Sequence, residues 1–271
     1  MLSRRQFLLT ASIAPLLQKR EQIITVNGAI RPSQMGKTLI HEHILVDFVG
    51  ADKINFDRWN REEVVKVVLP YLLEVKKHGI KTILDCTPAF LGRDVLLLRL
   101  LAQKSGLQIL TNTGYYGAVD NKYLPTWAFT ETAEQLADRW TAEFEKGIDG
   151  TDIKPGFLKI GVNPGHLSEL HRKLIRAAGL THLRTGLTIC SHTGPAVAAF
   201  EELEELQRVG VHPSAFVWVH AQNESNKNLY TKAAQMGAWV SLDGLGWGDW
   251  ENYATWIDLI KSNKLMHRVL I

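Results

Sequence analysis

From about residue 20 to its end, the chain alternates between short apolar runs and longer amphipathic stretches. The runs are rich in β-branched residues, as buried strands are, whereas the stretches repeat apolar residues at helical spacing. Strands that alternate with helices indicate parallel βαβ units. Eight strands in roughly 250 residues predict an α/β fold, a (β/α)8 TIM barrel, with a doubly wound open sheet as the alternative. The predicted strands are residues 38–43, 82–86, 109–113, 157–161, 187–192, 216–220, 238–243 and 268–271. The predicted helices are residues 61–77, 93–104, 132–146, 168–179, 196–209, 226–236 and 253–262.

The last predicted strand, residues 268–271, has no loop or helix after it. A complete barrel has both after its eighth strand. We therefore expect one domain over residues 21–271, with a barrel that is incomplete at its C-terminus and ends within strand eight.

The N-terminus carries a candidate export signal. Arg4 and Arg5 precede a short apolar run over residues 8–17. A twin arginine before such a run is typical of a Tat signal, and the run is too short for a usual membrane span. We predict a signal over residues 1–20 and an exported protein, periplasmic or extracellular, without stable membrane insertion after signal removal. The alternative is a basic arm that stays on the protein.

The charge of the chain is concentrated at this end. The formal net charge is +3, and the first twenty residues contain four basic residues but no Asp or Glu. The remainder is close to neutral, which gives no indication of a nucleic-acid partner.

Several predicted strands contain or end in side chains that can bind a metal ion. His41 and His43 lie two residues apart on the first strand, so both imidazoles point to the same face. Because the C-terminal strand ends form the catalytic face of a barrel, the later strand ends should meet this pair. The candidate set is His41, His43, Lys159, His192, His220 and Asp243. For His192 or His220 alone, a buried structural histidine is the alternative.

Lys159 is the unusual member of this set because it lies inside an apolar strand. Lysine is rarely buried, and burial favours the neutral form of an amine. A neutral amine can take up carbon dioxide and become a carbamate, an anionic oxygen ligand. The alternative is a lysine at the strand end whose amino group reaches solvent.

These features resemble the phosphotriesterase family of the amidohydrolase superfamily, over almost all of the chain after residue 20. The motifs are Thr25-Val26-Asn27-Gly28, Leu39-Ile40-His41-Glu42-His43, Gly92-Arg93-Asp94, Thr113-Gly114-Tyr115-Tyr116, Lys159, Ser191-His192-Thr193, Val219-His220 and Leu242-Asp243-Gly244. The resemblance implies that His41 and His43 hold a buried ion and that His192 and His220 hold a more exposed one. It further implies a carbamate on Lys159 that bridges the two ions, together with a hydroxide.

The same resemblance implies an activity. Two divalent ions, zinc with manganese or cobalt tolerated, would let the bridging hydroxide attack an ester or lactone carbonyl or a phosphoester. We assign catalytic roles to Lys159, Tyr116 and Asp243. The partner is then a small-molecule ester, lactone or phosphoester. Members of the family are often dimers, so the resemblance allows a homodimer, although the sequence itself does not indicate an oligomeric state.

This chain departs from the family pattern at three places. The family has a further ligand, an Asp at the end of strand eight, and the chain ends before that position. Gln222 and Glu224 follow His220 where organophosphate-degrading members carry acidic residues that relay protons. Tyr116 stands where those members have Trp and lactonase-like members often have Tyr, which favours a carbonyl ester or lactone. Two alternatives stay open: a non-catalytic barrel that only binds a ligand, and a hydrolase of amides or phosphodiesters.

Overall fold

The computed structural model describes residues 21–245 and 250–271, so the predicted signal over residues 1–20 lies outside the described residues. An antiparallel hairpin, which we did not predict, comes first and is followed by the strands of the barrel. The strands are β1 (Ile23–Thr25), β2 (Gly28–Ile30), β3 (Lys37–Glu42), β4 (Ile80–Asp85), β5 (Gln108–Leu110), β6 (Asn112–Thr113), β7 (Phe157–Gly161), β8 (Ile189–His192), β9 (Phe216–Val219), β10 (Trp239–Ser241) and β11 (Val269–Leu270).

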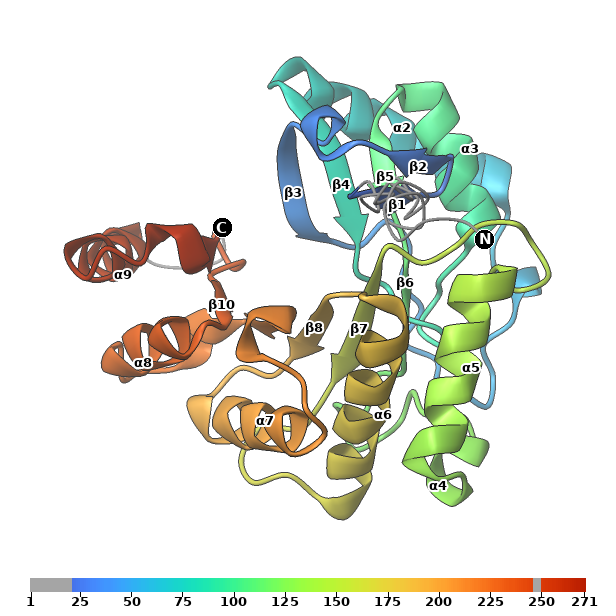
Figure 1. The fold of residues 1–271 in the computed structure, drawn as a ribbon. Coiled ribbons are helices and arrows are strands. Elements are labelled where there is room, and N and C mark those ends of the chain that lie inside the picture. The colour runs from blue at the N-terminus through green and yellow to red at the C-terminus, as the bar shows by residue number, and fades with distance from the viewer. Residues whose placement is uncertain (1–20, 246–249) are drawn as a thin grey trace, which may run out of the picture.

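The helices between these strands lie outside the sheet (Figure 1). They are α2 (Arg61–Lys77), α3 (Val95–Ser105), α4 (Trp127–Thr130), α5 (Ala133–Lys146), α6 (Glu169–Thr185), α7 (Ala196–Arg208), α8 (Asn228–Met236) and α9 (Trp250–Ser262). Short 3-10 turns lie at Pro32–Gln34, Phe56–Arg58, Pro213–Ala215, Ala221–Asn223 and Met266–Arg268. Within the described ranges, no helix is long and apolar enough to cross a membrane.

The barrel strands are parallel and lie side by side in chain order. One sheet has the order β3-β4-β5 and the other β6-β7-β8-β9-β10-β11. A doubly wound sheet would reverse its strand order near the middle. The uninterrupted order therefore excludes that alternative and confirms the predicted (β/α)8 fold.

The third predicted strand, residues 109–113, is not continuous. It bends at Thr111, so that β5 pairs with β4 while β6 pairs with β7. The backbone carbonyl of Thr111 accepts a hydrogen bond of 2.8 Å from the amide of Gly156, outside both ladders. This segment therefore forms the corner that joins the two sheets, a bend that local apolar pattern does not reveal.

The helix predicted over residues 168–179 was too short. The helix continues to Thr185 and ends at Gly186, which has the left-handed φ of 78° that favours glycine. Gly179 instead permits close packing, because a Cβ there would lie 2.6 Å from Cγ2 of Val209. Gly179 therefore lies within α6 and does not end it.

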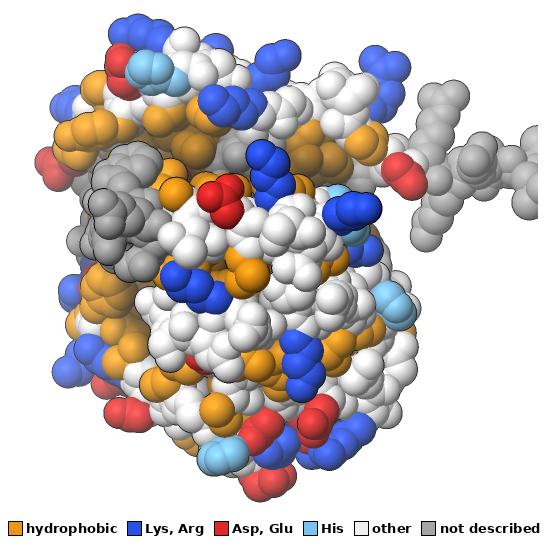
Figure 2. Space-filling view, turned by 90° about the vertical axis from the view of Figure 1, so that its left-hand side faces the viewer, with side chains coloured by type: hydrophobic (Ala, Val, Ile, Leu, Met, Phe, Trp, Pro, Cys, Tyr) orange, Lys and Arg blue, Asp and Glu red, His pale blue; other side chains and the backbone are white. Residues whose placement is uncertain are grey.

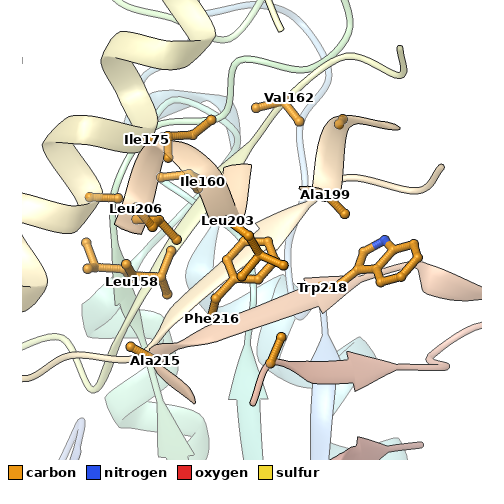
Figure 3. Packing of buried hydrophobic residues seen from close by; sticks show 14 of the residues in the cluster. Leu158, Ile160, Val162, Ile175, Ala199, Leu203, Leu206, Ala215, Phe216 and Trp218 are labelled. Carbon is orange, nitrogen blue, oxygen red and sulfur yellow. The ribbon is translucent and has the colours of Figure 1, made fainter. Parts of the chain in front are cut away.

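Side-chain alternation along each strand divides the buried residues into two sets. On β7 and β9, Leu158, Ile160, Phe216 and Trp218 point outward and pack against α6 and α7 (Figure 3). The residues between them point into the barrel, where Phe157, Cys190, Val217 and Val219 form part of a separate apolar cluster. By the same alternation, Lys159 points into the barrel.

On the face shown in Figure 2, basic and acidic side chains are interspersed among hydrophobic and uncharged groups. This agrees with the near-neutral composition of the chain after residue 20.

Candidate metal centre

The histidines predicted as ligands come together at the C-terminal ends of the strands. The ring centroids of His41 and His43 lie 5.2 Å apart, those of His41 and His220 lie 4.8 Å apart, and those of His192 and His220 lie 4.5 Å apart. On β3, the register with β4 shifts between Leu39 and Glu42. The four side chains, separated by up to 179 residues in sequence, form one cluster at the predicted edge of the barrel.

Asp243 binds two of these imidazoles. Its carboxylate oxygens lie 3.1 Å from Nδ1 of His41 and 2.7 Å from Nδ1 of His220. The Ser241 hydroxyl, the Gln222 side-chain amide and the backbone N–H of His220 also donate to it. His220 adopts a left-handed φ of 60°, which is uncommon for a residue with a side chain. The carboxylate therefore orients both rings through Nδ1 and leaves their Nε2 atoms for another partner.

His43 and His192 have different supports. Nδ1 of His43 lies 2.9 Å from the Thr87 hydroxyl, which in turn contacts the buried carboxyl of Asp85. The His192 ring contacts the edge of Tyr116 at a centroid distance of 5.0 Å. These residues surround the pair bound by Asp243.

The buried Glu202 of α7 supports the strand that carries His192. The hydroxyls of Ser191 and Thr193, which flank His192 in sequence, both donate to its carboxyl group. Burial raises the pKa of Glu202 to about 8, although these two hydrogen bonds and Lys159 oppose the rise. Glu202 thus fixes the end of β8 from the helical layer.

Lys159 is almost completely buried, with 1% of its surface exposed, and its Nζ has no hydrogen-bond partner in the described structure. It interacts electrostatically with His41, His43 and His192. The sequence left open a lysine that reaches solvent, and this burial excludes that alternative. An amino group left unsatisfied inside a barrel is costly unless a ligand or a modification completes its environment.

Burial also sets the charge of the histidines. Desolvation by burial is the main cause, and the nearby Lys159 is the second. Together they lower the pKa of His41 to about 4 and that of His192 to about 2. The pKa of His43 falls to about 3, first by burial and then by the neighbouring His41. Burial opposes ionisation of Asp243, but the hydrogen bonds from His220 and His41 hold its pKa well below the usual range. At neutral pH, these three histidines are neutral, the form that binds metal ions.

The cluster has the donor types of a transition-metal site. Ligand atoms of His41, His220 and Asp243 lie within 4.8 Å of one another, and no other such group of three occurs among the described residues. The family model of the phosphotriesterase family matches residues 21–266. The chain belongs to the phosphotriesterase family. Its fold, predicted from the strand pattern, is the fold of that family.

Relatives within the family carry different activities in their names. The Phosphotriesterase homology protein of Escherichia coli is 28% identical over 87% of this chain and 80% of its own length. An aryldialkylphosphatase of Saccharolobus solfataricus is 28% identical over 80% of this chain and 69% of its own. An N-acetyltaurine hydrolase of Rattus norvegicus is 28% identical over 92% and 79%. The crystal structure of a lactonase from Listeria monocytogenes superposes with a TM-score of 0.82 at 25% identity, over 92% of this chain and 81% of that one. The chain is therefore similar to hydrolases of several bond types.

The assignment of individual ligands to two ions stays a prediction, as do the catalytic roles of Lys159, Tyr116 and Asp243. The contacts of Asp243 are those of a residue that orients imidazoles. Tyr116 is nearly buried, and burial, followed by the nearby Tyr123, raises the pKa of its phenol well above the ordinary value. The phenol is therefore neutral, and its ring lies beside that of His192.

Sequence reasoning missed the second layer of the site. Asp85 and Thr87 lie at and just beyond the end of β4, so the rule that singled out the other strand ends applies to them too. Glu202 gave no such signal, because an acidic residue on an amphipathic helix usually faces water. Only its packing against β8 distinguishes it from a solvated glutamate.

Proposed function

We propose that the protein is a hydrolase that binds two zinc ions and cleaves a carbonyl ester or a lactone. The observation that carries this proposal is the convergence of four histidines around the buried, unpartnered amino group of Lys159. A purely structural cluster would be expected to satisfy that amino group with a hydrogen bond.

The residues present fit such a pair of ions. His41, His43 and His220 each engage Nδ1 with an oxygen of the protein, which leaves Nε2 as the ligand atom. Imidazole nitrogens and anionic oxygens are ligands that zinc accepts, and a carbamate on Lys159 would supply the oxygens. His41, His43, His192, His220 and the modified Lys159 would hold the ions.

When bound, the ions would supply Lewis-acid polarisation of the scissile bond and a lowered pKa for water. The chain supplies orientation. Asp243 fixes the rings of His41 and His220, and Glu202 fixes the strand end that carries His192. The neutral phenol of Tyr116 would donate a hydrogen bond to the substrate beside His192.

A lactone or other carbonyl ester is favoured over a phosphotriester for two reasons. Tyr116 occupies the position where lactonase-like members of the family often have tyrosine, and it contacts His192. The superposed crystal structure is that of a lactonase. Both support the choice of substrate class.

Hydrolysis of an amide is the second candidate, because one relative over most of this chain is an N-acetyltaurine hydrolase. One experiment tests both candidates, ester or lactone hydrolysis and amide hydrolysis. The metal content of the purified chain is measured first, and the metal-loaded protein is then screened against lactones, aryl esters, phosphotriesters and N-acyl amino acids. We expect two ions per chain and the highest kcat/KM on a lactone or ester. A chain that holds two ions but cleaves only amides would favour the second candidate. A chain without metal or hydrolysis would favour a barrel that only binds ligands.

We further propose export of the protein through its twin-arginine segment. Replacing Arg4 and Arg5 by Lys should retain the protein inside the cell, which fractionation and immunoblotting would detect. Equal distribution of both forms would contradict the proposed signal.

A further inference from the structure

A buried chain of polar groups lies behind His43, and the metal site proposed above does not account for it. The Thr87 hydroxyl lies 2.9 Å from Nδ1 of His43 and 3.3 Å from Oδ1 of Asp85. Asp85 and Thr87 are each 1% exposed. Both side chains are therefore shielded from water, and their hydrogen bonds decide how this chain is ordered.

The direction of these hydrogen bonds follows from the groups themselves. Oδ1 of Asp85 accepts from the Ile44 N–H and is therefore an acceptor toward the Thr87 hydroxyl, which has one hydrogen to donate. If the Thr87 hydroxyl donates to Asp85, it must accept from Nδ1–H of His43. The ring is then the tautomer with hydrogen on Nδ1, and Nε2 carries the free lone pair.

Asp85 also holds the backbone next to His43. The N–H of Ile44 donates to the same Oδ1 at 2.9 Å. Asp85 is thus linked to the ring of His43 through the Thr87 hydroxyl, and to the backbone next to His43 through the N–H of Ile44. Two points of attachment restrict both the position and the rotation of the imidazole.

The segment that carries Asp85 and Thr87 is itself held by a residue of β6, in the other sheet. The side-chain amide of the buried Asn112 donates to the backbone carbonyls of Asp85 and Thr87 at 2.9 and 3.0 Å. The Arg93 guanidinium donates to the carbonyl of Asn112 at 2.8 Å. This bracing makes the segment a rigid support.

We propose that Thr87 and Asp85 are positioning residues for His43: they impose its Nδ1–H tautomer and aim Nε2 at the metal ion. They do for His43 what Asp243 does for His41 and His220. The part about the ion rests on the proposed function, whereas the part about the tautomer does not. Partners of this kind typically change metal affinity by roughly 10–100-fold.

The test compares Thr87→Val, which removes the hydroxyl at nearly constant volume, with Thr87→Ser, which keeps it. Thr111→Val is the matched control, because the Thr111 hydroxyl is buried without a partner in the described structure. Asp85→Leu, which removes the acceptor oxygens at similar volume and should cause the same loss, is the second variant if Thr87→Val does not fold. Folding is checked by thermal unfolding of the metal-free proteins.

The first readout is the imidazole tautomer of His43 in metal-free protein, measured by 15N NMR. We expect Nδ1–H in the wild type, Thr87→Ser and Thr111→Val, and loss of that preference in Thr87→Val. The second readout is zinc affinity by chelator competition, with a loss of roughly 10–100-fold for one ion in Thr87→Val alone. An unchanged tautomer and unchanged affinity in Thr87→Val, or in Asp85→Leu if Thr87→Val does not fold, would overturn the inference. The expected tautomers in a wild-type chain that binds no zinc would instead overturn the proposed function and leave the positioning of the ring intact.

Discussion

Lys159 of β7 combines a side chain that is almost completely buried inside the barrel with an amino group that has no hydrogen-bond partner in the described structure. A buried polar group in this state lowers the stability of the fold. A lysine at this position is therefore best explained by a role of its amino group in the proposed metal centre.

We therefore predict opposite effects of Lys159→Met on stability and on metal binding. The metal-free variant should be more stable than the wild type by about 1–3 kcal/mol, because an unpartnered buried group is replaced by an apolar one. With metal present, kcat/KM should fall by roughly 100-fold or more, because a shared ligand is lost. Urea denaturation with chelator and metal analysis measure both effects. Wild-type metal content and activity in the variant would contradict the carbamate proposal.

Glu202 gives the fold a pH dependence of its own. Its folded-state pKa is raised by burial to about 8, above the ordinary value of 4.5. The folded state then binds the proton more tightly than the unfolded state does. The stability that this group contributes is complete below about pH 4.5 and is lost as the pH rises toward 8.

In metal-free protein, Glu202→Gln should remove this contribution to the pH dependence. The free energy of unfolding of the wild type should fall, relative to the variant, by on the order of 1 kcal/mol per pH unit between about pH 5 and pH 8. Denaturant titrations at pH 5, 6.5 and 8 measure the difference. Glutamine can still accept the hydrogen bond from Ser191, so the variant removes the titration and keeps this contact. If the free energy of unfolding depends on pH in the same way in both proteins, the pKa of Glu202 is not raised in the folded state.

At the scale of elements, α6 and α7 approach so closely that one of them needs a glycine. Gly179 is buried in α6, and a Cβ at this position would come within 2.6 Å of the stiff side chain of Val209. Alanine favours helices by about 1 kcal/mol over glycine, but overpacking costs about 1–3 kcal/mol. The clash should dominate because Val209 has little freedom to move.

Gly179→Ala should therefore lower stability by about 1 kcal/mol. The double variant Gly179→Ala, Val209→Ala should show a coupling that recovers part of this loss, as thermal or chemical denaturation of the four proteins in the cycle would reveal. If Gly179→Ala stabilises the protein, helix propensity outweighs the contact and our account of this glycine is wrong.

At the scale of the whole molecule, the site joins the two sheets. His41 belongs to β3 of the three-stranded sheet, whereas His192 and His220 lie at the ends of strands in the six-stranded sheet. The hydrogen bond between His41 and Asp243 is one link between the two. Ions bound by these histidines would add further links that only the folded state can make.

Removing metal should consequently destabilise the entire barrel. At a free-metal concentration 100 times Kd, binding adds about 2.7 kcal/mol to the free energy of unfolding. For a chain of this size, that shifts Tm by several degrees, at roughly 2–4 °C per kcal/mol. Differential scanning calorimetry with chelator, and again after metal is restored, measures the shift. Lys159→Met serves as the control and should respond less. An unchanged wild-type Tm would contradict metal binding at this site.

Much of the fold followed from local pattern. The barrel strands lie within a few residues of the predicted ranges, because a buried parallel strand must be apolar and a covering helix must be amphipathic. The bend at Thr111 and the length of α6 were missed because both depend on contacts with distant residues. Glycine often marks the end of a helix, but Gly179 lies inside α6 because close packing against Val209 leaves no room for a side chain.

By itself, the sequence determined the order of strands and helices and placed His41, His43, Lys159, His192 and His220 at one end of the barrel. It could do so because parallel strands in βαβ units all end at the same edge. Only the tertiary structure decided which polar groups face one another: Asp243 between His41 and His220, and the Thr87 hydroxyl behind His43. These contacts join residues far apart in the chain, and their geometry is set by the packing of the whole barrel, which no local pattern records.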